Sequence, residues 1–349
     1  MTQADQASRR TDSRTAAGKT VAVVGATGAV GAEMLRCLER SSFPTERLKV
    51  FASERSAGRK LVFRDREVAL EVLSDNAFEG VDVALFASES DVSKKYGPIA
   101  VSAGAVVIDN SSAFRMDPGV PLVVPEVNGR LITPDQRLYA NPNCVAVIMA
   151  VALWPLHQAA GITRIIASTY QSASGAGAAA MEELEVSTRA YLKGDTYEPR
   201  VLPHPYAFNL FSHNTAIGED GYNGEEQKVI AEMRKIMGLP GLRVGVTCVR
   251  VPVLRAHSMA LTVEFADRLE VGNARALLSS APGIRVVDDR LGNHFPMPVE
   301  SSGQDDVLVG RIREDVSDAS GRSLALFVSG DQLLKGAALN AVQIAERLV

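Results

Sequence analysis

The stretch Thr20-Val-Ala-Val-Val24, followed by Gly25-Ala-Thr-Gly28-Ala-Val-Gly31, decides the fold class of this chain. The first run is apolar and β-branched, which predicts a strand, and from Ala29 to Arg40 the apolar residues recur at helical spacing. A strand that turns through glycines into a helix is the unit in which a pyrophosphate rests on a helix amino terminus. The sequence therefore predicts a dinucleotide-binding domain.

The three glycines of this turn have distinct expected roles. Gly25 would permit the tight turn, Gly28 the approach of a phosphate to the backbone, and Gly31 the close packing of helix on strand. Their spacing is G-x-x-G-x-x-G rather than G-x-G-x-x-G, so a purely structural turn remains an alternative.

The residues after the second expected strand bear on the choice of cofactor. Leu48 to Ala52 predicts that strand, and Ser53-Glu-Arg-Ser56 follows it, with Arg59 close by. NAD-binding domains usually place an acidic residue here, to hold the ribose hydroxyls, whereas arginine suits a 2′-phosphate. Ser53, Arg55 and Ser56 favour NADP (NADPH), although Glu54 lies among them.

Two domains are expected from the order of the remaining segments. Buried strands at Val81 to Phe86 and Val106 to Asp109, with a helix at Val92 to Ala103 between them, predict an α/β, Rossmann-like, doubly wound parallel sheet. We place this domain at residues 19–144 and expect the segment 331–349, interpreted as an amphipathic helix, to complete it.

Residues 145–330 are expected to form a second, α+β, catalytic and dimerisation domain. Val145 to Ala160 predicts a long helix, kinked at Pro155 and ended by Gly161. The other expected elements are strands at Ile162 to Thr169, Leu242 to Val253 and Ser258 to Phe265, and an irregular surface excursion from Gly194 to Gly224.

The bulk composition excludes several classes of protein. Of 349 residues, 46% are hydrophobic and 22% charged, as in globular proteins. The net charge of -4 with no basic run gives no indication of nucleic-acid binding, and no apolar stretch approaches the ~20 residues that span a membrane. Three widely spaced cysteines favour a reducing compartment. Residues 1–18 lack the apolar core of a secretory signal and predict a disordered tail, so we expect a cytoplasmic protein without a metal site.

Cys144 is the strongest candidate nucleophile. It follows Asn141-Pro-Asn143 and immediately precedes the Val145 helix. A thiol at a helix amino terminus is expected to have a lowered pKa, because the helix dipole favours the thiolate. Cys37 and Cys248 lie inside a predicted helix and a predicted strand, so we expect both to be buried and inert.

A thiol nucleophile requires a partner that handles its proton. Among five histidines, His257 follows a strand that carries Arg250 and Arg255, which makes a catalytic and a structural role about equally supported. Arg115 ends Ser111-Ser-Ala-Phe-Arg115, beyond the strand end at Asp109, where ligands bind open α/β sheets. The spacing of Glu225 and Lys228 by itself favours a solvated charged helix face.

Together these segments resemble the aspartate-β-semialdehyde dehydrogenase family, from Val21 to the C-terminal helix. Five motifs fall in the family's order, and all five in order are highly specific: Gly25-Ala-Thr-Gly-Ala-Val-Gly31, Ser111-Ser-Ala-Phe-Arg115, Asn141-Pro-Asn-Cys144, Tyr170-Gln-Ser-Ala-Ser-Gly-Ala-Gly177 and Arg250-Val-Pro-Val-Leu-Arg-Ala-His257.

The resemblance implies a role for each matching residue. Cys144 would be the nucleophile, His257 the acid/base group and Gln171 the group that orients the acyl intermediate. Arg250 would bind the substrate α-carboxylate and Glu225 its amino group, while Arg115 and Lys228 would bind phosphate. Asn143 is a further expected substrate contact. The remaining expected cofactor contacts are Thr27, Ala29, Val30, Ser174 and Gly175.

The resemblance also implies the reaction. It is the NADP-dependent, reversible reductive dephosphorylation of L-4-aspartyl phosphate to L-aspartate-4-semialdehyde and inorganic phosphate, through a Cys144 thioester. This reaction serves the biosynthesis of lysine and diaminopimelate, threonine and methionine, and the family is typically homodimeric.

Three alternatives remain open at this point. A related enzyme such as N-acetyl-γ-glutamyl-phosphate reductase would share the thioester and differ in substrate. Glyceraldehyde-3-phosphate dehydrogenase fits less well, because its Cys-Thr-Thr-Asn pattern is missing around Cys144. A non-catalytic NADP-binding scaffold would have no use for Cys144, His257, Gln171 and Arg250 together.

Overall fold

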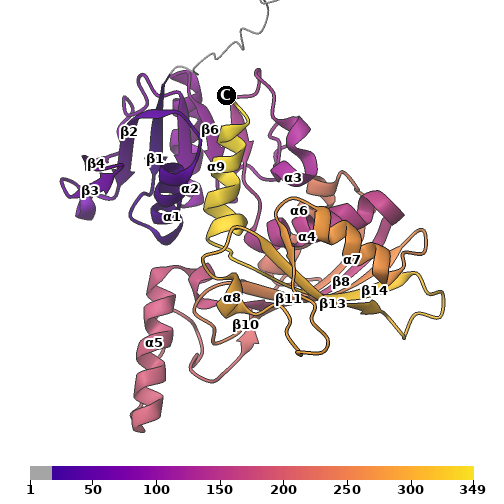
Figure 1. Ribbon diagram of the computed structural model, residues 1–349. Coiled ribbons are helices and arrows are strands. Elements are labelled where there is room, and N and C mark those ends of the chain that lie inside the picture. The colour runs from indigo at the N-terminus through magenta and orange to yellow at the C-terminus, as the bar shows by residue number, and fades with distance from the viewer. Residues whose placement is uncertain (1–17) are drawn as a thin grey trace, which may run out of the picture.

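The computed structural model describes residues 18–349 and arranges them around two sheets (Figure 1). This confirms the expected α/β fold, with a mostly parallel, doubly wound sheet followed by a second, mixed sheet. The disordered tail expected over residues 1–18 lies outside the described residues, except for Gly18. Across residues 18–349 no helix is both long and apolar enough to cross a membrane.

The first sheet has the strand order β3-β4-β2-β1-β5-β6-β7 and is parallel apart from the β3–β4 pair. Its central strand β1 pairs with β2 on one side and β5 on the other, so the order reverses there and a crevice opens between their carboxyl ends. The strands are β1 (Lys19–Val24), β2 (Thr45–Ala52), β3 (Lys60–Phe63), β4 (Arg66–Val72), β5 (Val83–Phe86), β6 (Val106–Asp109) and β7 (Leu138–Ala140).

Glycine geometry explains the turn that leads out of β1. Gly25 has a φ of 80°, and a Cβ there would lie 2.4 Å from the carbonyl oxygen of Ala87. A Cβ on Gly31 would lie 2.2 Å from the carbonyl oxygen of Gly25, which confirms its expected packing role. The turn leads from the carboxyl end of β1 into helix α1 (Ala29–Arg40), so α1 starts at the crevice. The other helices of this half are α2 (Ser90–Ser102) and the short α3 (Pro125–Asn128).

The second sheet is mixed and has the order β12-β13-β14-β11-β8-β10-β9. Its strands are β8 (Ile162–Gln171), β9 (Phe211–Ser212), β10 (Arg243–Arg250), β11 (His257–Phe265), β12 (Ile284–Val286), β13 (Val307–Glu314) and β14 (Ser323–Gly330). The helices are α4 (Cys144–Ala160), α5 (Ala178–Lys193), α6 (Gly224–Met237), α7 (Val271–Ser280) and α8 (Pro298–Ser301). In Figure 1, α4, α6 and α7 lie on one side of the sheet, and α5 projects away from the body.

The apolar side of this sheet packs on α4, whose side chains are buried almost all round from Val145 to Leu153. The helix runs through Pro155 to Ala160 and ends before Gly161, as predicted. Three expected details differ from the structure. β10 stops at Arg250 rather than Val253 because Pro252 cannot continue the ladder, and the β3–β4 hairpin and the β13–β14 pair were not predicted.

The C-terminal segment is the largest correction. Most of it is helical, as expected, because a π-helical turn over Leu334–Ala338 leads into α9 (Leu339–Glu346). It is not amphipathic, since nearly all side chains from Asp331 to Ala345 are buried. The segment lies between the two halves of the molecule, against α1 and α4, so it has no solvent face (Figure 1). Within it, Lys335 Nζ lies 2.7 and 2.6 Å from the Glu126 carboxylate oxygens, which neutralises a buried cation.

The stretch from Gly194 to Gly224 is also less superficial than expected. Leu202, Tyr206 and Phe211 form a small core with residues of α5, and β9 adds an antiparallel edge to β10. That pairing brings His213 inward, where its backbone N–H donates to the carbonyl of Cys248 at 2.9 Å. The segment therefore supplies part of the region around β10.

Candidate active site

A cavity of about 390 Å³ lies where the two halves of the molecule meet. It takes Val30 from α1, Ser88 to Ser90 from the carboxyl end of β5, and Cys144 from the start of α4. The second sheet and α6 add most of the other expected site residues, namely Gln171, Ser174, Gly175, Glu225, Lys228, Arg250 and His257. Val30 is the one residue of the segment 25–31 that lines this cavity together with the candidate nucleophile, and the expected contacts Gly25, Thr27, Gly28 and Ala29 lie outside its lining.

Asn143 fixes the position of Cys144. It is the N-cap of α4, and its Oδ1 accepts the backbone N–H of Val145 at 2.9 Å and of Ala146 at 3.3 Å. Its Nδ2 donates to Glu225 Oε1 at 2.9 Å, and its backbone N–H donates to Glu232 Oε2 at 2.5 Å. Cys144 is therefore the first residue of a helix whose start is held by four hydrogen bonds.

The expected lowering of the Cys144 pKa is wrong for the free protein. Burial, together with the nearby Glu225 carboxylate, raises the pKa of the Cys144 thiol to about 12. Arg115, Arg250 and the amide of Val145 oppose this shift without cancelling it. A helix terminus alone does not offset the desolvation of an enclosed thiolate. Cys37 and Cys248 are buried, as expected.

His257 is fully buried at the start of β11. Its Nδ1 accepts the backbone N–H of Ser172 at 3.0 Å, and its Nε2 is a buried atom with no hydrogen-bond partner within residues 18–349. Gly175 lies directly against this ring, because a Cβ there would be 3.0 Å from Nε2. Burial and the charge of Arg250 lower the pKa of His257 to about 3, so the ring is neutral at physiological pH.

Gln171 and Glu225 are joined by a hydrogen bond. Gln171, at the end of β8, donates from Nε2 to Glu225 Oε1 at 3.1 Å and accepts from Thr169 at 3.1 Å. Glu225 is only 7% exposed, so the solvated charged face suggested by the spacing to Lys228 is wrong. Burial opposes ionisation of Glu225, but His213 and the bonds from Asn143 and Gln171 outweigh it and lower its pKa.

Arg250 is buried at the end of β10 and is held by a residue that sequence reasoning missed. His213 Nε2 lies 2.8 Å from Arg250 Nη2, and the carbonyl of Ser172 accepts from Nη1 at 3.3 Å. His213 lies in an irregular segment with no motif around it, so only the β9–β10 pairing reveals its position. Arg255, by contrast, faces away from the cavity and binds Asp331 and Glu33.

Arg115 is anchored at the opposite wall of the cavity. It donates to the carbonyls of Asn110 at 2.7 Å and Asn141 at 2.9 Å, and pairs with Glu232 at 3.1 Å. Glu232, from the buried side of α6, was also missed, because a lone acidic residue in a helix carries no sequence signal. Three of the five N–H groups of Arg115 are thereby used, which leaves two for a ligand.

The expected cofactor contacts gather at the carboxyl edge of the first sheet. Thr27 and Gly28 are exposed at the start of α1, whose first turn holds no acidic residue, so the helix terminus can accept an anion. The backbone N–H groups of Gly25 and Ala26 bond to the carbonyl of Phe51, which places the end of β2 beside the turn. Ser53, Arg55 and Ser56 follow at once.

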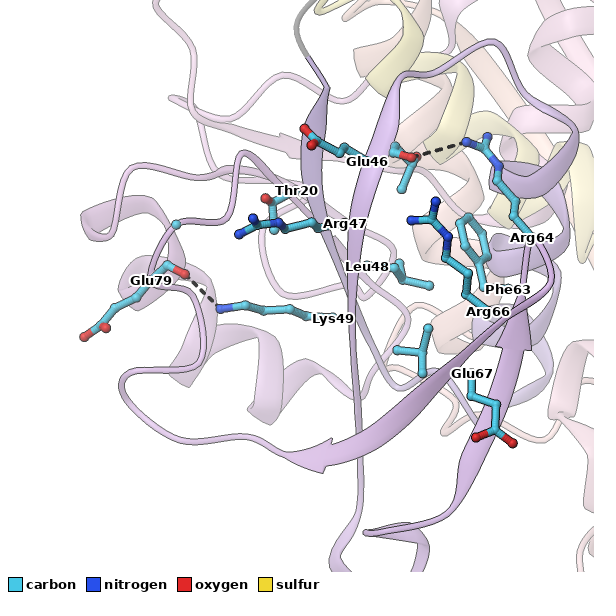
Figure 2. Close-up of a pocket in the computed structure, with 13 residues that line it drawn as sticks. Thr20, Glu46, Arg47, Leu48, Lys49, Phe63, Arg64, Arg66, Glu67 and Glu79 are labelled. Carbon is cyan, nitrogen blue, oxygen red and sulfur yellow. Dashed lines mark hydrogen bonds between the residues drawn. The ribbon is translucent and has the colours of Figure 1, made fainter.

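A second cavity, of about 700 Å³, lies away from this site (Figure 2). It is lined by Thr20, Arg47 and Lys49 at the amino-terminal ends of β1 and β2, and by Arg64 and Arg66 of the β3–β4 hairpin. Its cations are partly engaged: Arg64 donates to Thr45 and Leu38 carbonyls, and Lys49 to those of Ala77 and Glu79. Ligands of open α/β sheets bind at the other, carboxyl edge.

Two protein families match the chain, one for each half. The semialdehyde dehydrogenase NAD-binding domain matches residues 20–133, and the semialdehyde dehydrogenase dimerisation domain matches residues 153–335. Fold and matches together define the class: an NAD(P)-dependent oxidoreductase of the semialdehyde dehydrogenase type.

Individual relatives narrow this class. The aspartate-semialdehyde dehydrogenase of Synechocystis is 50% identical over 329 residues, covering 94% of this chain and 97% of the relative. The aspartate-semialdehyde dehydrogenase of Bacillus subtilis is 44% identical over 339 residues, which cover 95% of this chain and 97% of the relative. A solved structure, aspartate semialdehyde dehydrogenase II of Vibrio cholerae complexed with ASA, matches with a TM-score of 0.92 and 41% identity, covering 95% of this chain and 98% of that one. The chain belongs to the aspartate-semialdehyde dehydrogenase family.

The electrostatics of Cys144 can be tested by alkylation. In the free protein the rate of Cys144 alkylation should rise about tenfold per pH unit between pH 7 and 9, because its pKa lies near 12. The change Glu225→Gln removes a negative charge that raises this pKa, so alkylation at a fixed pH should become several-fold faster. Mass spectrometry of the Cys144 peptide measures both rates.

The matched control is Glu182→Gln, which removes an exposed carboxylate from α5. It should leave the rate unchanged. An unchanged or slower rate in Glu225→Gln would show that Glu225 does not control the thiol.

Proposed function

We propose that this chain catalyses the reversible, NADP-dependent conversion of L-4-aspartyl phosphate to L-aspartate-4-semialdehyde and phosphate through a thioester on Cys144. The single observation that carries this proposal is that Cys144, at the capped start of α4, shares one cavity with Arg115, Arg250 and His257, whose Nε2 has no hydrogen-bond partner among the residues that the structure describes. A reaction of this kind belongs to the biosynthesis of lysine and diaminopimelate, threonine and methionine.

In the oxidative direction, the Cys144 thiol adds across the aldehyde carbonyl: Sγ bonds to the carbon, and the thiol proton passes to the carbonyl oxygen as the C=O π bond breaks. The carbonyl oxygen, which gains charge in this step, takes a hydrogen bond from His257 Nε2–H. A bound NADP would supply the hydride acceptor for that carbon, and the proton on the oxygen would pass to solvent as the thioester forms. An oxygen of phosphate then bonds to the acyl carbon of the thioester as the carbon–sulfur bond breaks, and the Cys144 thiolate leaves. Gln171 orients the acyl group during these steps.

Two pairs of charged residues suit the two ends of the substrate. Arg250 presents a fork that fits the α-carboxylate, and the ionised Glu225 fits the α-ammonium group. Arg115 and Lys228 line the same cavity and supply the positive charge that inorganic phosphate or the acyl phosphate requires. Asn143, which links Glu225 to the start of α4, keeps these groups in register with the sulfur.

NADP is the cofactor we propose within the NAD(P)-dependent class. The pyrophosphate would bind the amino terminus of α1 through Gly25, Thr27, Gly28, Ala29 and Val30. Ser53, Arg55 and Ser56, beside that turn, would contact the 2′-phosphate, and Ser174 and Gly175, which line the cavity with Cys144, would contact the nicotinamide. No carboxylate other than Glu54 stands in the run from Ser53 to Arg59 to favour NAD.

A homodimer is supported by the match to a dimerisation domain and by the uncovered side of the second sheet. β8 is an inner strand, yet Ile166 and Tyr170 on its outer face are 42% and 38% exposed. The Tyr170 ring packs on Phe327 of β14, with centroids 6.2 Å apart, which extends this apolar row across the sheet. We propose that a second copy of the chain covers it.

The reaction is tested by following nicotinamide absorbance with purified protein, NADP and L-aspartate-4-semialdehyde. Reduction should depend on inorganic phosphate, and Cys144→Ala should lose at least about 10³-fold in kcat, because the thioester can no longer form. The Cys144→Ala variant should still bind NADP. If the folded protein does not reduce NADP in this assay, the proposal is wrong, and a glutamyl-type substrate becomes the next to test.

Cofactor choice is tested with Arg55→Ala. Loss of a charged contact to the 2′-phosphate should raise the KM for NADP roughly tenfold and leave the KM for NAD unchanged. Arg47→Ala, which removes an exposed cation at the opposite end of the first sheet, serves as control. Equal effects of Arg55→Ala on both cofactors would exclude a 2′-phosphate contact.

The dimer is tested by sedimentation velocity. Wild type should sediment as two 37.2-kDa chains, and Ile166→Glu, which places a charge on the outer face of β8, should shift the equilibrium toward single chains. Val62→Glu is a matched control, because Val62 is 67% exposed on β3 of the other half. A dimer unaffected by Ile166→Glu would place the interface elsewhere.

A further inference from the structure

The hydrogen bond to His257 Nδ1 has a defined direction. The donor is the backbone N–H of Ser172, at 3.0 Å, and a backbone amide cannot act as acceptor. The Nδ1 lone pair is therefore in use, and the single proton of the neutral ring resides on Nε2. Nε2 lies against Gly175 and has no hydrogen-bond partner in the described part of the protein, residues 18–349.

A chain of hydroxyl groups leads from the same ring nitrogen to the C-terminal segment. Ser172 Oγ lies 3.1 Å from His257 Nδ1 and 3.0 Å from Ser174 Oγ, and Ser174 Oγ accepts a hydrogen bond from Gln332 Nε2. All four side chains are buried, so these groups exchange hydrogen bonds with one another rather than with bulk water.

Gln332 sets the direction in which the hydrogen bonds along these hydroxyl groups run. Its Oε1 accepts the backbone N–H of Ala256 at 2.9 Å, which fixes the amide so that Nε2 points at Ser174. A flipped amide would bring two donors together. Because Gln332 donates to Ser174, the Ser174 hydroxyl is free to donate to Ser172, and the Ser172 hydroxyl to donate to Nδ1.

We propose that Ser172, Ser174 and Gln332 are positioning residues that hold His257 in its neutral Nε2–H tautomer, so that the ring donates a hydrogen bond to the reacting oxygen of the substrate. This inference rests on the proposed function for the identity of that oxygen. It assigns Gln332, 75 residues from His257 in the sequence, to the machinery of the reaction. A neutral imidazole that acts as an electrophile is an established catalytic device in other enzymes.

The charged surroundings of His257 agree with a neutral ring. Arg250 from β10 and His213 beside it face the ring, Glu225 approaches from α6, and Cys144 shares the cavity from α4. Desolvation and Arg250 lower the pKa of His257, and the nearby Glu225 carboxylate opposes this only in part. A second proton on Nδ1 would also meet the N–H of Ser172 head on.

The change Gln332→Glu tests the direction of the hydrogen bonds that run from Gln332 to His257. The new carboxylate keeps an acceptor for Ala256 N–H but cannot donate to Ser174, so the hydroxyls should reverse and Ser172 Oγ should change from donor to acceptor at Nδ1. The backbone N–H of Ser172 would then be the one group that still opposes a proton on Nδ1. Nitrogen NMR of histidine-labelled free protein, assigned by loss of the His257 signal in His257→Asn, reads this directly. Wild type should show a protonated Nε2 and a bare Nδ1, and Gln332→Glu should show part of the His257 population protonated on Nδ1.

Kinetics provide the second readout. In Gln332→Glu the reversed Ser172 hydroxyl can accept a hydrogen bond from Nδ1–H and so stabilise the doubly protonated ring. The pKa of His257 should therefore rise toward its ordinary value of about 6.5. The pH profile of kcat for Gln332→Glu should therefore gain an acid limb near that value that wild type lacks. At pH 8 its kcat should fall roughly tenfold with a smaller change in the substrate KM, because a tautomer change affects the transition state more than binding.

Ser301→Ala is the matched control. Its hydroxyl belongs to a separate buried chain, 2.8 Å from Ser329 Oγ, which continues to Ser258 next to His257 in β11. This variant should alter neither the NMR signals nor the pH profile. Should Gln332→Glu fail to fold, Ser174→Ala interrupts the chain without adding charge, and part of the His257 population should then carry its proton on Nδ1.

Two results would overturn the inference. One is a wild-type His257 that carries its proton on Nδ1, and the other is unchanged NMR signals in Gln332→Glu. Because the NMR experiment uses free protein without substrate, its failure leaves the proposed reaction untouched. Conversely, a wild-type protein that does not turn over aspartate semialdehyde would remove the proposed function and leave the tautomer measurement valid.

Discussion

The cap of α4 by Asn143 is the constraint on which the site depends. One side chain accepts the first free N–H groups of the helix and donates to Glu225, while its backbone N–H is held by Glu232. Glu225 in turn accepts a hydrogen bond from Gln171, and Glu232 forms an ion pair with Arg115. The nucleophile, the proposed ammonium ligand and the proposed phosphate ligand are thus fixed relative to each other through a single residue, at the point where the first sheet's domain passes into the second.

Burial produces the opposite of what the helix dipole alone would give at Cys144. The dipole acts at partial-charge strength, whereas enclosure removes the solvation of a full negative charge, and Glu225 adds repulsion. The resting thiol is therefore protonated, even with the positive charges of Arg115 and Arg250 nearby. The same enclosure keeps His257 neutral, so both reactive groups rest in their uncharged forms.

Local sequence patterns predicted the elements that are locally determined. The βα unit at Thr20 to Arg40 and the buried helix after Cys144 have the bounds expected from apolar periodicity and flanking glycines, within a residue. The burial of Glu225, the inward turn of His213 and the role of Glu232 depend on contacts between segments far apart in the chain, and no spacing encodes them. The amphipathic character predicted for the C-terminal segment was wrong for the same reason. Its apolar residues were expected to face one side, but α1 and α4 pack against the segment from two directions. The five family motifs, read together, identified the cavity residues that periodicity could not.

The π-helical turn near the C-terminus has a consequence for how the protein is made. Gly336 lies so close to the nucleophile that a Cβ there would be 2.9 Å from Cys144 Cβ, and Gln332 completes the wall beside Ser174. On the ribosome, Cys144 emerges almost two hundred residues before Gly336. During that interval the nascent chain can fold its first sheet, yet the thiol has no wall on this side. The reactive centre is closed only by a segment synthesised almost two hundred residues after Cys144, so a nascent chain arrested between the two lacks part of the site and leaves the cysteine uncovered on this side.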